Sequence, residues 1–433
     1  MDRVPAGGAL QAGACVAVIG GGPAGSAFAL HVLRWARESS RDIKVVIFEY
    51  KDFGKRGPAG CNRCAGILSS RSLQELEGLG LHVPQRLIMG YLQSYLLHLP
   101  DGAIEIHQPR PEQKVMSVYR GGGPLHADLS PDVSFDAWLL DQARAAGAEI
   151  VSAAVRKVSA GPLMVVETES EGREFDLVVL ATGVNGRPPA MVGLPYAPPE
   201  TETMAQDELA RGLHPPVDES GRVHVYVGAK MGLLFGALIP KGDLINVSLL
   251  GHRLDDDPIG RFLRLPELEE LRESGIRRLC GCHPRVAVSP GGHPFAPRFV
   301  AVGDAAVTRL YKDGIGSAFT TARQAAWTAV HLGVSTSAFA HGYAPLCRTI
   351  ARDNTWGRLL FWVWQRSQSY PALARYWLSV LSFEQALPAQ EQRVSIALWD
   401  LLTGTGSYGS ICRTMLSWHL AGHFSARPAA RRG

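Results

Sequence analysis

The apolar positions near the start of the chain predict a buried strand, a glycine turn and a helix in direct succession. Residues 14–19 are all small or apolar, which is typical of a parallel strand that is covered on both faces. The run ends in the sequence GGGPAG at residues 20–25, and a helix is expected to start there. A second apolar run, Ile43–Phe48, predicts the next strand. Together these elements indicate a βαβ unit over residues 14–49.

Alternation of apolar and polar residues later in the chain predicts antiparallel strands. Residues 91–99 and 103–107 alternate in this way on the two sides of a Pro-Asp-Gly turn, which is typical of a hairpin. Residues 222–251 contain three further candidate strands. These two segments are expected to belong to an antiparallel sheet that is distinct from the N-terminal unit.

The other regular elements are expected to be a meander of strands and several helices. Residues 135–147 have the spacing of an amphipathic helix that ends at a glycine. A long helix is expected to start near residue 314 and to run to about 331, and the chain after residue 345 has a helical pattern. The strands of the meander are expected near residues 153–158, 163–168 and 173–181.

Composition and charge narrow the class of protein. The net charge of +4 is mild and no basic block is interleaved with aromatic residues, so a nucleic acid is not expected as a partner. No uninterrupted apolar run reaches the ~18 residues of a membrane-spanning helix, and the N-terminal apolar run belongs to the first strand rather than to a signal peptide. Seven cysteines, an odd number, favour a reducing compartment, so a cytoplasmic protein is expected.

The glycine turn has the spacing of a dinucleotide-binding motif. Gly20 would allow the tight turn, Gly22 would let a pyrophosphate approach the backbone, and Gly25 would let the helix pack closely on the strand. Glu49 follows the second strand, at the spacing where an acid is expected to bind a ribose hydroxyl. The pattern therefore predicts a dinucleotide cofactor at the start of the first helix.

Two later motifs stand in the order that a known family shows. One buried strand runs into the sequence ATG at residues 181–183, and another ends in Gly303-Asp304, with Gly314 and Gly316 downstream. Together with the glycine turn, these motifs resemble the FAD-dependent oxidoreductases of the aromatic-hydroxylase (glutathione-reductase-like) fold. Within that group, the chain is most similar to the geranylgeranyl reductase-like branch.

The resemblance covers about residues 14–345 and implies a fold. That fold is α/β, with a split Rossmann-like FAD-binding domain, an antiparallel β substrate domain and a C-terminal helical region. The implied boundaries are 14–80, 120–186 and 286–345 for the FAD-binding domain, 81–119 and 187–285 for the substrate domain, and 346–433 for the helical region.

The resemblance also implies roles around the flavin. Asp304 would accept hydrogen bonds from the ribityl hydroxyls, and Gly314 and Gly316 would let the backbone approach the pyrimidine edge of the ring. The helix N-terminus there would stabilise negative charge on the reduced ring. The implied cofactor-binding residues are Gly20, Gly22, Pro23, Ala24, Gly25, Glu49, Tyr50, Arg120, Gly183, Asp304, Gly314, Ile315 and Gly316.

The stretch from Phe235 to Gly251 resembles the aromatic-x-x-x-Pro motif of the substrate sheet in the geranylgeranyl reductase-like branch. It lacks both tryptophans of the Trp-x-Trp-x-Ile-Pro motif of flavin halogenases, so halogenation ranks low. One departure is that a proline usual before the Gly-x-Gly pair is replaced in the region of Tyr311. The implied substrate-binding residues are Tyr226, Phe235, Ile239 and Pro240.

Cysteines near the flavin leave several interpretations open. Cys64 is the implied catalytic residue, because the segment that starts there resembles a cysteine-glycine segment beside the flavin. Cys61 and Cys64 form C-x-x-C, which could also be a redox dithiol or two incidental loop thiols. Cys280 and Cys282 are spaced too closely for a zinc knuckle, so no metal is expected.

The resemblance implies an enzyme in which reduced FAD reduces carbon-carbon double bonds of a prenyl or other apolar substrate by hydride transfer. The alternative within flavin chemistry is a monooxygenase that hydroxylates or epoxidises an apolar or aromatic substrate. A non-catalytic electron relay through the Cys61/Cys64 pair is an alternative of another class.

Partners are expected from the same reasoning. No second complete G-x-G-x-x-G is present, so the reductant would be transiently bound NAD(P)H or another donor, such as an electron-donor protein. The C-terminal helices are rich in tryptophan and arginine. That composition suits either a helical cap on the flavin domain or peripheral contact with a membrane.

Overall fold

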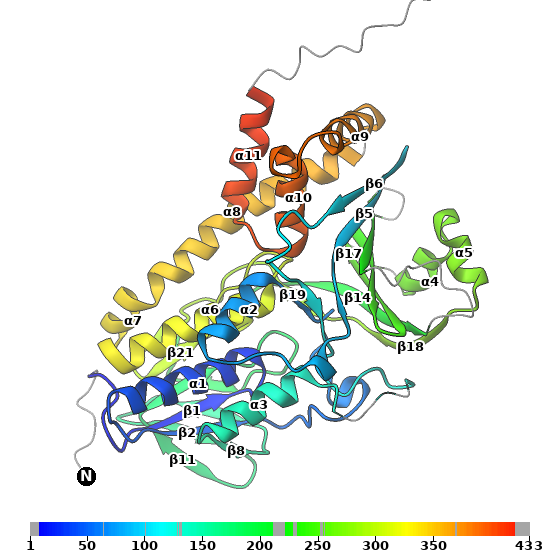
Figure 1. Cartoon of the computed structure of the whole chain (residues 1–433). Helices are drawn as coiled ribbons and strands as arrows, with labels where there is room; N and C mark the ends of the chain where they lie inside the picture. The colour runs from blue at the N-terminus through cyan, green and yellow to red at the C-terminus, as the bar shows by residue number, and fades with distance from the viewer. Residues whose placement is uncertain are drawn as a thin grey trace, which may run out of the picture.

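The computed structural model describes residues 8–63, 65–99, 101–127, 129, 132–210, 221–227, 232–251, 254, 256–368 and 370–420. A mostly parallel sheet and its helices occupy one end of the molecule, and a second large sheet lies beside them (Figure 1). The C-terminal helices extend over the second sheet (Figure 1).

A six-stranded sheet carries the N-terminal glycine turn. Its elements are β1 Cys15–Ile19, β2 Lys44–Phe48, β8 Glu149–Val151, β12 Leu177–Leu180, β20 Phe295–Ala296, β21 Phe299–Ala301, α1 Pro23–Glu38, α3 Phe135–Ala145 and α6 Gly314–Trp327. The strand order is β20-β21-β12-β1-β2-β8, and every pair except β20–β21 is parallel. Helix α1 packs against α3 and α6. The predicted βαβ unit and the helix expected at 135–147 are therefore confirmed.

The expected meander is correct only in part. Its strands are β9 Lys157–Ser159, β10 Met164–Glu167 and β11 Gly172–Phe175, which form a separate four-stranded sheet with β13 Ala190–Val192. The single strand expected at 173–181 is two strands, because the chain leaves this sheet after β11 and enters the parallel sheet as β12. Asp176 anchors the crossing: its Oδ2 accepts a hydrogen bond from the Cys15 amide at 3.0 Å, and its Oδ1 pairs with Arg298 at 3.4 Å.

The second large sheet gathers strands from distant parts of the chain. They are β5 Ser94–Leu99, β6 Gly102–His107, β14 Thr201–Ala210, β15 Arg222–Tyr226, β16 Leu233–Lys241, β17 Leu244–Gly251, β18 Arg277–Cys282 and β19 Arg285–Ala287. The order is β18-β14-β17-β16-β15-β5-β6, with β19 beside β14. The strands expected at 103–107 and 222–251 are confirmed, and the one expected at 91–99 is confirmed from Ser94 onward, because Tyr91 belongs to a separate small sheet. The sheet is antiparallel except for the parallel pair β15–β5, where the two distant segments meet.

Two short helices cover one face of this sheet. They are α4 Pro258–Leu263 and α5 Glu269–Glu273. Phe262, Leu263 and Leu271 pack there against apolar residues of β14, β16 and β17. A small sheet of β3 Ile67–Leu68, β7 Met116–Ser117 and β4 Gly90–Tyr91, together with α2 Ser70–Gly78, connects the two large sheets along the chain. The opposite face of the second sheet is left to the C-terminal helices and to a cavity.

The expected C-terminal helical region is confirmed. It comprises α7 Thr336–Gly342, α8 Ala344–Gln368, α9 Pro371–Gln385, α10 Arg393–Thr403 and α11 Tyr408–Leu420. Trp399 and Tyr408 are fully buried, and the Trp399 ring meets Tyr95 of β5 edge-to-face at 5.3 Å between centroids. These helices thus share an apolar core with the second sheet.

The outer surface of α8 carries exposed aromatic side chains, including Trp356 and Trp362. Among the described residues, we find no helix with the length and apolar character needed to span a bilayer. Contact of the C-terminal helices with a membrane surface stays a prediction.

A single buried carboxylate joins α9 to α10. Glu384 is fully buried, and its Oε1 accepts a hydrogen bond from the Val394 amide at 2.8 Å. Its Oε2 accepts from both the amide and the hydroxyl of Ser395, at 2.8 and 2.9 Å. These are N-terminal amides of α10, whose own N-cap residue, Gln392, makes no side-chain cap. Glu384 therefore caps the next helix in the chain.

We expect Glu384→Ala to lower the free energy of unfolding by roughly 2–4 kcal/mol, because it leaves buried amides of α10 without an acceptor. Urea unfolding followed by circular dichroism measures this change. Glu391→Ala, which removes an exposed carboxylate from the same connection, is the matched control. Equal stability of the two variants would contradict the capping role.

Candidate active site

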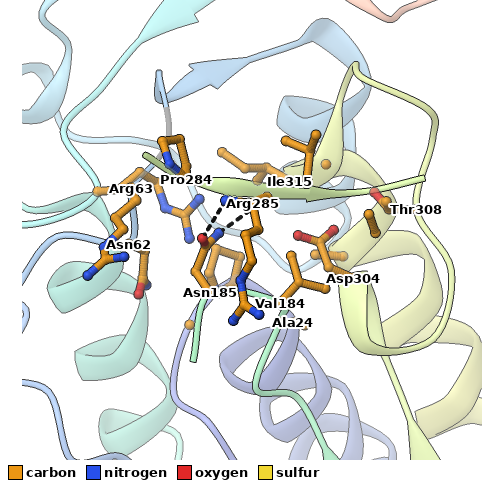
Figure 2. Close-up of a pocket in the computed structure, with 18 of the residues that line it drawn as sticks. Ala24, Asn62, Arg63, Val184, Asn185, Pro284, Arg285, Asp304, Thr308 and Ile315 are labelled. Carbon is orange, nitrogen blue, oxygen red and sulfur yellow. Dashed lines mark hydrogen bonds between the residues drawn. The ribbon is translucent and has the colours of Figure 1, made fainter. Parts of the chain in front are cut away.

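A large cavity lies where the carboxyl ends of the parallel strands face the second sheet. It starts at the glycine turn after β1, passes Asp304 and Gly314, and ends against β15 and β16. In the view of Figure 2, Asp304 and Ile315 lie on one side of the space, and Asn62 and Arg63 lie on the other. The cavity thus joins the predicted nucleotide-binding turn to the predicted substrate sheet.

The three glycines of the turn have different surroundings. Gly20 has φ +106°, and a Cβ atom there would lie 2.6 Å from the Ala181 carbonyl oxygen. A Cβ on Gly25 would lie 1.9 Å from the Gly20 carbonyl oxygen. Both positions therefore exclude any larger residue. Gly22 lines the cavity. A Cβ atom added to Gly22 would lie 3.5 Å from its nearest neighbour, the side-chain Nδ2 of Asn62, so a ligand can approach the backbone here.

The N-terminus of α1 faces the cavity without a protein cap. Its N-cap residue, Gly22, has no side chain, Pro23 follows it, and the first turn contains no acidic residue. Helix N-terminal amides carry partial positive charge and need acceptors. This end of α1 is therefore suited to a phosphate group.

Glu49 holds the glycine turn in place. Its Oε2 accepts a hydrogen bond from the Gly21 amide at 2.8 Å, and its Oε1 accepts from the Lys51 amide at 2.8 Å. Burial raises the pKa of this carboxyl, although the two backbone donors act against that shift. Glu49 also lines the cavity, beside Tyr50. The residue predicted to bind a ribose thus has a second, structural role that sequence spacing did not indicate.

Asp304 lies at the middle of the cavity, in a short 3₁₀ turn directly after β21. The turn is fixed by the preceding residue, because Gly303 has φ +62° and its amide donates to the Thr321 hydroxyl at 2.9 Å. Burial raises the pKa of the Asp304 carboxyl, while nearby Thr308 and Arg120 act in the opposite direction. The position leaves a half-buried carboxylate facing the cavity.

The loop before α6 brings backbone to the cavity wall. Asp313 has a left-handed conformation (φ 51°), and its Oδ1 accepts hydrogen bonds from the hydroxyls of Ser69 and Ser72, at 2.7 and 3.1 Å. Because its side chain is bound to α2, it makes no side-chain cap on α6. Gly314 and Ile315 line the cavity, and the start of α6 at these residues has no side-chain cap.

Arg120 is held by a network behind the cavity wall. Its Nη2 donates to Oδ2 of the fully buried Asp136 at 2.8 Å, and the Asn62 side chain donates to the same oxygen. Lys51 in turn donates to Oδ1 of Asn62 at 3.2 Å. The network ties the loop after β2 to the start of α3.

The cofactor-binding residues expected from the sequence fall into two groups. Most of them line the cavity, whereas Gly25 and Gly316 shape the helix starts from behind it. Those on the cavity wall are Gly20, Gly22, Pro23, Ala24, Glu49, Tyr50, Arg120, Gly183, Asp304, Gly314 and Ile315. Their individual roles toward a cofactor stay predictions.

Two of the four expected substrate-binding residues line the cavity. Phe235 and Ile239 do so, together with Ala237, because alternate residues of β16 share one face of the sheet. Tyr226 was placed wrongly: its ring stacks on His98 at 4.2 Å and meets Phe262 edge-to-face, under the helices on the opposite face.

The fourth expected residue, Pro240, is buried outside the cavity, where its carbonyl accepts a hydrogen bond from the Ser117 hydroxyl at 3.2 Å. Cys64, the expected catalytic residue, lies outside the described residues. Cys61, Cys280 and Cys282 line a separate small cavity behind Arg120.

Several cavity residues had no signal in the sequence. Asn185 and Arg285 join two distant segments, since the Asn185 side chain bonds both the carbonyl and the amide of Arg285, at 3.0 and 2.8 Å (Figure 2). Leu402 and Thr403 reach the cavity from α10, in the part of the chain that the family resemblance did not cover. No motif or periodicity indicates such residues.

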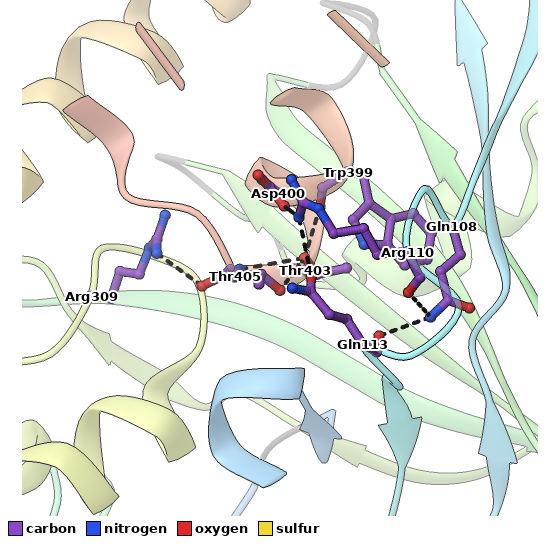
Figure 3. Close-up of polar contacts among 9 residues, drawn as sticks. Gln108, Arg110, Gln113, Arg309, Trp399, Asp400, Thr403 and Thr405 are labelled. Atoms are coloured by element: carbon purple, nitrogen blue, oxygen red, sulfur yellow. Dashed lines mark hydrogen bonds and ion pairs between the residues drawn. The ribbon is translucent and has the colours of Figure 1, made fainter. Parts of the chain in front are cut away.

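The end of α10 is fastened to the loop that precedes α6. Arg309 donates from Nη1 to the Gly404 carbonyl at 2.9 Å, and Asp400 of α10 pairs with Arg110 at 3.4 Å (Figure 3). Gly404 has φ +79°, and a Cβ there would lie 2.6 Å from the Asp313 Cβ. The C-terminal helices therefore close the cavity and help to position its wall.

No protein-family model and no curated protein sequence matches this chain. Its structure is similar to that of a geranylgeranyl bacteriochlorophyll reductase-like protein from Thermoplasma acidophilum, with a TM-score of 0.66 and 17% identity over 93% of this chain and 95% of the other. The halogenase PltM in complex with FAD has a TM-score of 0.60 and 12% identity, over 92% of this chain and 85% of the other.

A third similar structure is p-nitrophenol 4-monooxygenase PnpA from Pseudomonas putida DLL-E4, with a TM-score of 0.60 and 15% identity over 92% of this chain and 100% of the other. These likenesses confirm the fold that the sequence motifs implied. The chain has the α/β fold of FAD-dependent oxidoreductases, with a C-terminal helical region. At such low identities, the reactions in these names belong to those proteins.

We expect Gly404→Ala to lower the free energy of unfolding by about 1–3 kcal/mol, because a Cβ at this left-handed position would collide with Asp313. Urea unfolding of the purified variant measures the loss. Gly409→Ala is the matched control: a Cβ there would meet the Trp356 ring at an ordinary 3.4 Å. A Gly404→Ala variant as stable as the wild type would show that this contact does not constrain the loop.

Proposed function

We propose that the protein binds FAD in this cavity and acts as an FAD-dependent oxidoreductase. The residues present fit such a cofactor. The uncapped N-terminus of α1 at Gly22 is open to a pyrophosphate, and Glu49 lies beside it on the same wall. Asp304 supplies a half-buried carboxylate for ribityl hydroxyls, and the start of α6 supplies amides for the pyrimidine edge of the ring.

We further propose that the enzyme reduces carbon-carbon double bonds of a prenyl or other apolar substrate. The observation that carries this proposal is the continuity of the cavity from the nucleotide-binding turn to an apolar wall on the second sheet. That wall consists of Val223, Val225, Phe235, Ala237 and Ile239. FAD bound there would supply hydride transfer, and the protein would orient an apolar chain against the sheet and exclude water.

The reductant would be NAD(P)H or another electron donor. Similarity to a protein named as geranylgeranyl bacteriochlorophyll reductase-like supports alkene reduction. Similarity to a p-nitrophenol monooxygenase keeps oxygen chemistry as the second candidate, since both share the fold. One rapid-mixing experiment separates the two reactions.

In that experiment, FAD-loaded protein is reduced without oxygen and mixed with geraniol, geranylgeraniol or geranate. We expect the flavin absorbance to return as the oxidised form while the added compound gains two hydrogens, measured by mass spectrometry. Free reduced FAD with the same compounds is the control. The reductase proposal fails if no reduced product forms without oxygen. An oxygenated product that forms once oxygen is added, after a transient change in flavin absorbance, would favour the monooxygenase instead.

Cofactor binding has its own test. We expect Asp304→Ala to weaken FAD binding by about 10- to 100-fold, because hydrogen bonds to a carboxylate contribute roughly 1.5–3 kcal/mol. Fluorescence titration of apo-protein with FAD measures the dissociation constant. Asp141→Ala, which removes an exposed carboxylate from α3, should bind FAD like the wild type. An unchanged dissociation constant for Asp304→Ala would place the ribityl chain elsewhere.

A further inference from the structure

Lys312 reaches across the cavity from the loop before α6 to the substrate sheet. It lines the cavity between Tyr311 and Asp313, and its Nζ lies 4.3 Å from the centre of the Phe235 ring on β16. Phe235 faces the cavity, so the ammonium group lies at the end where a substrate would contact the sheet. No motif in the sequence indicated this lysine.

The charge of Lys312 has no counter-ion among the described residues. Three carboxylates of nearby loops and helices have other partners: Oδ1 of Asp313 accepts from Ser69 and Ser72, Glu202 accepts from the Tyr311 hydroxyl at 2.9 Å, and Asp400 pairs with Arg110. The second oxygen of Asp313, Oδ2, makes no hydrogen bond with a described residue. The charged group that acts on it is another cation, Arg309. Burial and the repulsion from Arg309 lower the pKa of Lys312 to about 8.

Arg309 does not share the role of Lys312. Its guanidinium stacks on the Tyr408 ring at 4.1 Å and its Nη1 donates to the Gly404 carbonyl, which holds the C-terminal helices. Its buried Nε and Nη2 have no hydrogen-bond partner among the described residues. Lys312 makes the cation–π contact with Phe235 and no ion pair with any of the described residues. An ammonium group in an apolar enclosure costs free energy unless an anion pairs with it. The free protein therefore holds an unpaired positive charge at the substrate end of the cavity.

We propose that Lys312 binds the carboxylate of the substrate, so that the substrate is an apolar organic acid rather than a neutral hydrocarbon or alcohol. This inference rests on the proposed function, because it names the class of molecule that the apolar end of the cavity accepts. One ammonium group matches the single charge of a carboxylate. A diphosphate carries more charge than one lysine can neutralise, and the nearest wall of the sheet offers the Phe235 ring and aliphatic side chains.

The assigned contact orients the substrate. An acid head at Lys312 leaves the apolar chain of the substrate to contact the apolar side chains of the same cavity, among them Val223, Val225 and Ile239. Lys312 acts here as a specificity-determining residue and takes no part in bond making. Substitution of Lys312 is therefore expected to change the affinity of the protein for its substrate and to leave its affinity for FAD unchanged.

The test compares geranate with geraniol. The two molecules share the same hydrocarbon chain, but geranate ends in a charged carboxylate and geraniol ends in a neutral hydroxyl. Both are titrated calorimetrically into FAD-loaded protein at pH 7. We expect geranate to bind at least about tenfold more tightly than geraniol, since a charge-assisted hydrogen bond contributes roughly 1.5–3 kcal/mol. In Lys312→Met the preference should fall below about threefold, and Lys312→Arg should retain most of it.

A pH series separates ion pairing from a packing role. Geranate is ionised throughout pH 6.5–9.5, and the protonated lysine is the form that binds it. The affinity of the wild-type protein for geranate should therefore be constant below about pH 8. Above that pH the affinity should fall by up to about tenfold per pH unit. Lys312→Arg should show no such fall, because arginine stays charged. Geraniol binding should not depend on pH.

Several outcomes would overturn the inference. The inference fails if geranate does not bind to FAD-loaded protein, or if the wild type binds geranate and geraniol with equal affinity. It also fails if Lys312→Met keeps the preference for geranate, or if geranyl diphosphate binds more tightly than geranate. These readouts need no turnover. A protein that reduces geraniol but fails to prefer geranate would reject the role of Lys312 and leave the proposed reaction standing. A protein that does not take up FAD would reject the proposed function itself.

Discussion

The close approach of backbone segments at Gly20 is the constraint on which the cavity depends. The backbone of Gly20 lies in close contact with Ala181, directly after β12, and Gly25 in the first turn of α1 lies in close contact with Gly20. Glu49, at the end of β2, bonds the Gly21 amide between them. Three parallel strands thus meet at one turn with no space for a side chain. The result is a helix N-terminus that lies at the sheet edge and is open to a ligand.

Around that turn, distant segments are held by buried polar contacts rather than by the turn itself. Asp136 binds Arg120, Asp313 binds the start of α2, and Glu384 caps α10. Asp136 and Glu384 are fully buried and partnered, which is what a low-dielectric interior requires. Lys312 departs from this rule, because its charge faces the cavity without an anion among the described residues. That contrast makes it informative about what the cavity receives.

Periodicity was a reliable guide where one physical requirement determined the residue type. Continuous apolar strands and the glycine spacing located β1, α1 and β2, and Asp304 was found because the strand before it ends in a small-residue turn. Periodicity failed where the chain changes sheets at Asp176, since β11 and β12 are separated by this one residue and no glycine or proline marks the crossing. It failed again at Tyr226, because alternation shows that two faces differ and does not show which face meets the cavity.

The sequence by itself determined the order of strands and helices and the glycine turn, because these follow from local sterics and from burial on regular elements. The class of fold came from the resemblance of its motifs to a known family. Tertiary structure alone decided that α10 would close the cavity, that Asn185 would bind Arg285, and that Lys312 would lie over Phe235. Such contacts join residues far apart in the chain. They depend on how whole sheets pack together, and no short-range pattern of residues records that packing.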